Sequence, residues 1–163
     1  MTALDFHTGV ADKLDYTCRL VRKAWRAGHR VVVTGAADQL SRLDVLLWTF
    51  DRHEFLPHAR LGACQPMPPE LARTPVWLAD AADDAALGEA GSTVLINLGP
   101  DVAAGWQAYA RLIEIVANAD DEAASGRQRW RQYLAAGSSP VNHAQSAAEL
   151  GAVVVAEVGG NAA

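Results

Sequence analysis

The chain has 163 residues, half of them apolar, which is enough for one hydrophobic core and too few for two ordinary domains. Its net charge of -5 argues against broad binding of a phosphate backbone, because proteins that do this carry a basic face. Cys18 and Cys64 have neither the spacing of a zinc site nor a disulfide framework. With no secretory signal pattern and no run of about 18 apolar residues, we expect a cytoplasmic protein without membrane partners.

Short β-rich runs alternate with longer helical patterns, which predicts an α/β fold with a mainly parallel sheet and helices on both faces. The first strand is expected at residues 4–8. Apolar residues at helical spacing then predict a helix over residues 12–27, which stops before Gly28. In chain order, the other expected strands are residues 30–34, 56–61, 75–79 and 93–98, and the other expected helices are residues 38–50, 106–118 and 123–136.

Three further segments have the composition of loops or extensions. Prolines remove amide donors from residues 62–73, and acidic and small residues at 80–92 predict a turn-rich connection. From Ser138 onward the chain is rich in Ser, Ala, Gly and Asn. The valines at 153–155 are its apolar cluster, which a short helix or an added strand could include. We therefore predict one domain, residues 1–137, and a flexible C-terminal extension, residues 138–163.

The turns after the predicted strands lack the signatures of nucleotide-binding enzymes. GAADQLSRLD, which follows the strand at 30–34, has neither the second glycine nor the Lys-Ser/Thr of a phosphate-binding loop. The chain also lacks G-x-G-x-x-G, and the strand at 93–98 presents Asn97 near its end where a dinucleotide site would use a carboxylate. These absences argue against a nucleotide-dependent α/β enzyme, which stays as the weaker alternative.

Other catalytic and metal-binding patterns are no better represented. No G-x-S-x-G is present to place a nucleophilic serine. His53 and His58 flank Glu54 and could share a metal with it, but His58 follows Pro57 in an apolar context, where a hydrogen bond to the backbone is the expected role. We expect no catalytic residue, no metal site and no cofactor.

Three arginines surround a tryptophan in the predicted last helix. Arg127, Trp130 and Arg131 stand at i, i+3 and i+4 and share one face, whereas Arg129 points elsewhere. This face suits an acidic peptide with an apolar end, because guanidinium groups pair with carboxylates and an aromatic wall buries apolar side chains. Periodicity alone somewhat favours a core Trp130 with solvated arginines. A third possibility is single-stranded nucleic acid, with Trp130 stacked on a base, although the net negative charge argues against it.

Five motifs occur in an order that is typical of one replication protein family. They are W-R-x-G-x-R-V at residues 25–31, R-L-D-V-L-L-W at 42–48, E-F-L-P-H at 54–58, V-L-I-N-L at 94–98, and R-x-R-W-R-x-Y-x-x-A-G at 127–137. Over about residues 6–137 the chain thus resembles the chi subunit of the bacterial DNA polymerase III holoenzyme. The resemblance implies a single Rossmann-like domain without nucleotide chemistry. Polymerase activity would then belong to the assembly and not to this chain.

The resemblance also implies partners. The family joins the clamp loader, through the psi subunit, to the C-terminal tail of the single-stranded DNA-binding protein. That tail has acidic residues before a terminal apolar pair. The chain would therefore meet DNA only indirectly, and would be nucleoid-associated through the replisome.

The family's tail pocket corresponds to five residues here: Trp48, Val116, Arg127, Trp130 and Arg131. We expect Val116 late in the helix that precedes the arginines. By resemblance, Arg127 pairs with the terminal carboxylate or an acidic side chain of the peptide, and Arg131 contacts acids further upstream. Trp48, Val116 and Trp130 would enclose the apolar end.

The chain departs from some family members in the pocket helix. Some family members have a lysine one turn before the first arginine of the pocket helix, where this chain has Ala123, so weaker binding is expected. The psi-facing surface has no clear signature. Phe55 and Pro57 are candidates for it, with core packing as the alternative.

Overall fold

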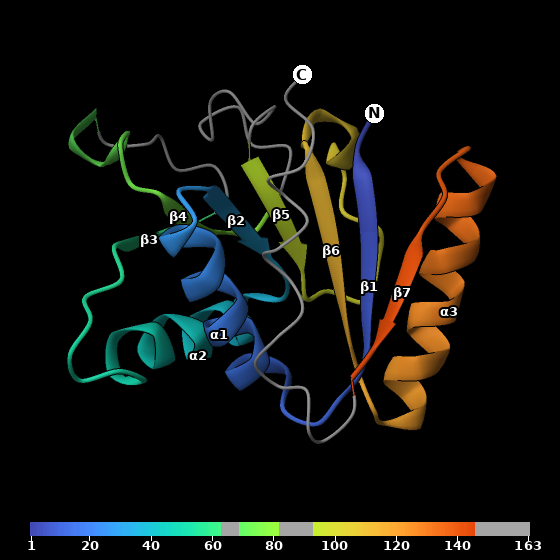
Figure 1. Ribbon diagram of the computed structural model, residues 1–163, viewed down its shortest axis with the longest axis horizontal. Helices are drawn as coiled ribbons and strands as arrows, with labels where there is room; N and C mark the ends of the chain where they lie inside the picture. The colour runs from blue at the N-terminus through green and yellow to red at the C-terminus, as the bar shows by residue number, and fades with distance from the viewer. Residues whose placement is uncertain (63–68, 82–92, 146–163) are drawn as a thin grey trace.

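The computed structural model describes residues 1–62, 69–81 and 93–145. A seven-stranded sheet, in which every described strand pair is parallel, runs through them in the order β3-β4-β2-β5-β6-β1-β7 (Figure 1). The strands are β1 (Ala3–Val10), β2 (Arg30–Thr34), β3 (His58–Leu61), β4 (Val76–Ala79), β5 (Thr93–Asn97), β6 (Arg111–Ala117) and β7 (Val141–Ala144). The helices are α1 (Lys13–Arg26), α2 (Ala37–Thr49) and α3 (Asp120–Ala135), with 3₁₀ turns at η1 (Pro69–Leu71) and η4 (Trp106–Ala108).

The sheet separates two hydrophobic cores, because successive side chains of a strand point to opposite faces. In β2, Val31 and Val33 join the core under α1 and α2, whereas Val32 joins the core that holds Trp106 and Tyr133. Helices α1 and α2 therefore cover one face, and α3 with η4 covers the other. The predicted α/β fold, with a parallel sheet between helices, is confirmed.

The first helix shows how local sequence sets its ends. The Asp12 carboxylate accepts a hydrogen bond from the Asp15 amide at 3.0 Å and caps the N-terminus of α1. After α1, Gly28 adopts φ 86° and donates its amide to the Trp25 carbonyl. A left-handed residue of this kind is the common end of a helix and is easiest for glycine. The predicted helix at 12–27 is confirmed with small changes at its ends.

The predicted helix at residues 106–118 is wrong. A single 3₁₀ turn, Trp106–Ala108, is followed by strand β6, Arg111–Ala117, which lies between β5 and β1. Leu112 and Val116 enter one core, and Ile113 and Ile115 enter the other, so β6 is apolar on both faces. A short apolar run of this kind cannot be distinguished from a buried helix by periodicity.

The predicted flexible extension is also partly wrong. Residues Val141–Ala144 form β7, which pairs in parallel with β1 from Asp5↔Val141 to Thr8↔Ala144. The sheet therefore continues beyond Gly137, the predicted end of the domain. The valines at 153–155, half of the predicted loop at 62–73 and most of the predicted connection at 80–92 lie outside the described residues.

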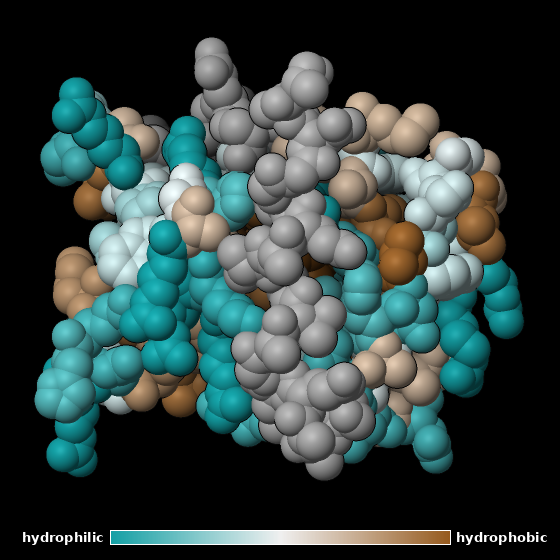
Figure 2. Space-filling model, viewed as in Figure 1, coloured by the Kyte–Doolittle hydropathy of each residue, from teal (hydrophilic) through white to brown (hydrophobic). Residues whose placement is uncertain are grey.

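The face that carries α1 is largely hydrophilic, with its apolar residues in separate patches (Figure 2). None of the helices in the described ranges has both the length and the apolar character to cross a membrane.

Candidate functional site: a pocket between helix α3 and the sheet

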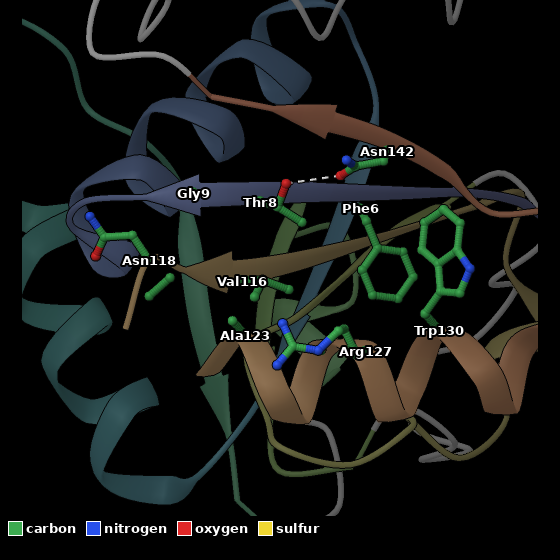
Figure 3. Close-up of a pocket in the computed structure, with 11 residues that line it drawn as sticks. Phe6, Thr8, Gly9, Val116, Asn118, Ala123, Arg127, Trp130 and Asn142 are labelled. Carbon is green, nitrogen blue, oxygen red and sulfur yellow. Dashed lines mark hydrogen bonds between the residues drawn. The ribbon is translucent and has the colours of Figure 1, made fainter. Parts of the chain in front are cut away.

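A pocket of about 520 Å³ opens between α3 and the part of the sheet formed by β6, β1 and β7 (Figure 3). This volume lies within the range of sites that hold small ligands or a few residues of a peptide. Strands β1 and β7, far apart in the sequence, each contribute to it. The lining residues are Phe6, Thr8, Gly9, Val116, Ala117, Asn118, Ala123, Gly126, Arg127, Trp130 and Asn142.

One end of the pocket is apolar. The rings of Phe6 and Trp130 meet edge to face with centroids 5.0 Å apart, and Val116 is buried beside them. Gly126 lets α3 come this close to β6, because a Cβ at that position would lie 2.9 Å from Val116 Cγ2. The pocket can therefore bury an apolar side chain against a rigid wall.

The other end of the pocket is polar, and the positively charged side chain of Arg127 also lines the pocket. The Thr8 hydroxyl donates to Asn142 Oδ1 at 2.9 Å, which joins β1 to β7 at the rim. Arg127 lines the pocket with an exposed side chain, and Arg131 is exposed on the next turn of α3. Neither arginine has an ion pair or a hydrogen bond within the described residues. A free guanidinium beside an apolar pocket is suited to a carboxylate on an apolar group.

A buried polar network lies beneath this pocket. Glu114 on β6 accepts hydrogen bonds from Arg129 Nε at 2.8 Å, Asn97 Nδ2 at 2.9 Å and the Tyr133 hydroxyl at 2.5 Å. Burial raises the pKa of Glu114, although the Arg129 charge and the three donors act in the opposite direction. Burial also raises the pKa of Tyr133 strongly, and the adjacent Glu114 charge adds to this shift, so its hydroxyl stays a hydrogen-bond donor.

A second exposed surface lies on the opposite face of the sheet. We define the aromatic patch as Val45, Trp48 and Phe55, of which Trp48 is 51% exposed and Phe55 is 66% exposed. The Trp48 and Phe55 rings lie 5.4 Å apart, and the Trp48 ring lies 4.4 Å from the buried His58 ring. His58 Nδ1 lies 2.8 Å from the carbonyl oxygen of Leu56, so the expected backbone hydrogen bond is present. In the described ranges, no group of three or more His, Cys, Asp or Glu side chains is placed to hold a metal ion.

The model of the family described as DNA polymerase III chi subunit, HolC, matches residues 1–140 of the chain. The chain belongs to this family. It is 30% identical over 151 residues to DNA polymerase III subunit chi of Pseudomonas aeruginosa, a match covering 88% of this chain and 96% of that protein. It is 26% identical over 121 residues to DNA polymerase III subunit chi of Haemophilus influenzae, covering 72% and 77% of the two chains. The resemblance read from the motifs is confirmed, and membership supports an accessory role in replication.

The structure brings together three of the five residues predicted for the chi tail pocket. Val116, Arg127 and Trp130 line the pocket, with Val116 on strand β6 and not in a helix as predicted. Arg131 is on α3 but outside the pocket lining. Trp48 does not join them, because α2 packs on the opposite face of the sheet and Trp48 forms part of the aromatic patch.

Sequence reasoning missed the strand side of the pocket. Phe6, Thr8 and Asn142 line it together, because β7 pairs with β1. Neither strand carries a local pattern that predicts this pairing. The buried Arg129 was also missed, although the lone Glu114 in the apolar run R-L-I-E-I-V-A is a signal that a buried partner is needed.

Proposed function

We propose that this chain is a non-catalytic accessory subunit of DNA polymerase III that links two partners. The pocket beside α3 binds the acidic C-terminal tail of the single-stranded DNA-binding protein. The psi subunit, and through it the clamp loader, binds elsewhere on the chain. The observation that carries the proposal is Arg127, which has no ion pair among the described residues, at the mouth of an apolar pocket formed by Phe6, Val116 and Trp130.

The chemistry of the pocket fits a peptide that combines carboxylates with an apolar end. The apolar side chain would lie against Phe6, Val116 and Trp130, while Arg127 pairs with a carboxylate of the same peptide. Exposed ion pairs contribute only about 0.2–1 kcal/mol each, whereas full burial of one large apolar side chain contributes about 1.5–3 kcal/mol. Affinity would therefore come mainly from the pocket, and the arginines would add orientation and selectivity. Ala123 lines the pocket and adds no charge, in keeping with the expectation of modest affinity.

The aromatic patch supports the second partner. Exposed apolar groups that lie together mark interaction sites more often than scattered ones do. Val45, Trp48 and Phe55 combine the end of α2 with the loop that leads to β3, at the opposite end of the strand order from the pocket. We therefore assign the psi-facing surface to this patch. The sequence already made Phe55 a candidate for this surface. Trp48, which the sequence assigned to the tail pocket, is now assigned to the psi-facing surface instead.

Single-stranded nucleic acid is less well supported as a ligand of the pocket. A base needs a free aromatic face on which to stack. Trp130 is partly buried against Phe6 and the neighbouring core, so much of its ring is already in contact. The net charge of -5 also lowers the affinity expected for a phosphate backbone.

The test is fluorescence anisotropy of a labelled peptide from the tail of the single-stranded DNA-binding protein. Arg127→Ala is expected to weaken binding by up to about fivefold, which corresponds to about 1 kcal/mol, whereas Trp48→Ala should leave it unchanged. In co-purification with psi, Trp48→Ala should weaken the association and Arg127→Ala should leave it unchanged. Equal binding by the wild type and Arg127→Ala would contradict the pocket assignment. No binding by the wild type would contradict the tail-binding function itself.

A further inference from the structure

The sheet-facing side of α3 is unusual for a helix that covers a sheet. Its buried residues are Gly126, Arg129 and Tyr133, at i, i+3 and i+7, so they form one face. Helices normally dock with a stripe of apolar side chains. Here the middle position is an arginine whose side chain is only 2% exposed.

Arg129 is held by directional bonds on two sides. Its Nε donates to Glu114 Oε2 at 2.8 Å, while Nη1 donates to the Pro100 carbonyl at 3.1 Å and to Ser125 Oγ at 2.8 Å. Hydrogen bonds to charged groups are stronger than neutral ones and fix orientation as well as distance. A leucine at this position could slide along the sheet, whereas this guanidinium cannot move without breaking a bond.

Glu114, the partner of Arg129 in this contact, is itself held in place by hydrogen bonds. Glu114 lies on β6 and is 0% exposed. It accepts its other two hydrogen bonds from Tyr133 of α3 and from Asn97 at the end of β5. Val116 lies two residues further along β6 and so points to the same face, where it packs against Gly126 and lines the pocket. The bond at Glu114 therefore sets how α3 lies over the pocket floor.

We infer that the buried Arg129–Glu114 pair positions the peptide site by fixing the rotation of α3, so that Arg127 and Trp130 stand over the pocket. Arg127 precedes Arg129 by two residues and Trp130 follows it by one. A rotation of the helix by one residue, about 100°, would turn both side chains away from β1 and β6. Recognition sites tolerate errors of only about 10–20° in such angles. The inference rests on the proposed function of the pocket.

The experiment compares peptide affinity with stability in the full chain. Arg129→Met is expected to weaken binding of the labelled tail peptide at least tenfold, at a temperature where all variants are folded. Val21→Ala, in the core under α1 on the opposite face, serves as the control for lost stability. It should lower the melting temperature yet change the peptide Kd less than twofold. The indole N–H resonance of Trp130 should shift in Arg129→Met and stay in place in Val21→Ala.

A milder variant covers the case in which Arg129→Met does not fold. Tyr133→Phe keeps the ring contacts with Phe6 and Trp106 and removes one hydrogen bond to Glu114. It should weaken the peptide about threefold, the effect of one ordinary hydrogen bond. Wild-type affinity in Arg129→Met, or in Tyr133→Phe if only that variant folds, would overturn the inference and leave the proposed function standing. A wild type that does not bind the peptide would overturn both.

Discussion

Mild acid should destabilise this protein through one buried histidine. His7 on β1 is 1% exposed, and its Nδ1 makes a hydrogen bond with the Tyr16 hydroxyl of α1. The His143 ring lies 5.3 Å from it and bonds to Asp5 at 2.8 Å, and Arg111 pairs with the other oxygen of Asp5 at 2.7 Å. Burial, followed by the neighbouring His143, lowers the pKa of His7 from 6.5 to about 4, and Asp5 only partly opposes this.

The direction of this change in folding stability follows from how many protons the folded and unfolded states bind. Between pH 6.5 and about 4 the unfolded chain binds a proton at His7 and the folded chain does not, so stability falls as the pH is lowered. The full pKa difference corresponds to about 3 kcal/mol, because one unit is worth about 1.36 kcal/mol. At pH 5, where the unfolded state is almost fully protonated and the folded state is not, the loss is about 2 kcal/mol.

Urea unfolding followed by circular dichroism at pH 7 and pH 5 measures this loss. Because other groups also titrate, the useful quantity is the difference between the wild type and His7→Gln. His7→Gln should lose about 2 kcal/mol less than the wild type over this range. His53→Gln, which removes an exposed histidine, should behave like the wild type. If His7→Gln lost as much stability as the wild type, the buried neutral His7 would not be the cause.

Three further outcomes follow from single contacts. Gly126→Ala should lower the melting temperature, because overpacking against Val116 costs about 1–3 kcal/mol and exceeds the gain of about 1 kcal/mol in helix propensity. The same substitution should cost less when it is made in a Val116→Ala background, and a stabilised single variant would contradict the close contact. Asp12→Ala should cost about 1 kcal/mol in urea unfolding, because it removes the cap on Asp15, while Asp12→Ser should not; equal losses would contradict the cap. Arg131→Ala should reduce peptide affinity about two- to fivefold at low salt and less at high salt, measured by anisotropy; a salt-independent loss would place Arg131 inside the pocket.

The sequence was sufficient to predict a helix or strand wherever the pattern of apolar residues in that element distinguishes the two. Helix α1 has one buried face and a capping aspartate, and β2 is a short run of valines. Strand β6 gave no such signal, since both of its faces are buried in the middle of the sheet. Its lone Glu114 was the clue, because a carboxylate in an apolar run must meet a partner, and Arg129 is that partner.

The candidate site was predictable on its helical side only. Arg127 and Trp130 share a helix face that spacing alone defines, and both line one pocket in the structure. The opposite wall depends on β1, β6 and β7 coming together from distant parts of the chain, which no local pattern encodes. Trp48 was misplaced for the same reason. The order of motifs indicates the family, but the direction of each crossover decides on which face a helix lies.

The separation of the two exposed surfaces has a consequence for the proposed linking role. The pocket lies over β6, β1 and β7, whereas the aromatic patch lies beside β3 on the other face, with the packed sheet between them. Partners at these places would not exclude one another. Substitutions at separated sites usually have additive effects, within about 0.3–0.5 kcal/mol. Trp48→Ala and Arg127→Ala should therefore each weaken the binding of one partner and leave the affinity for the other within about twofold, as a passive bridge requires. A larger cross-effect would mean that the sheet transmits binding from one face to the other.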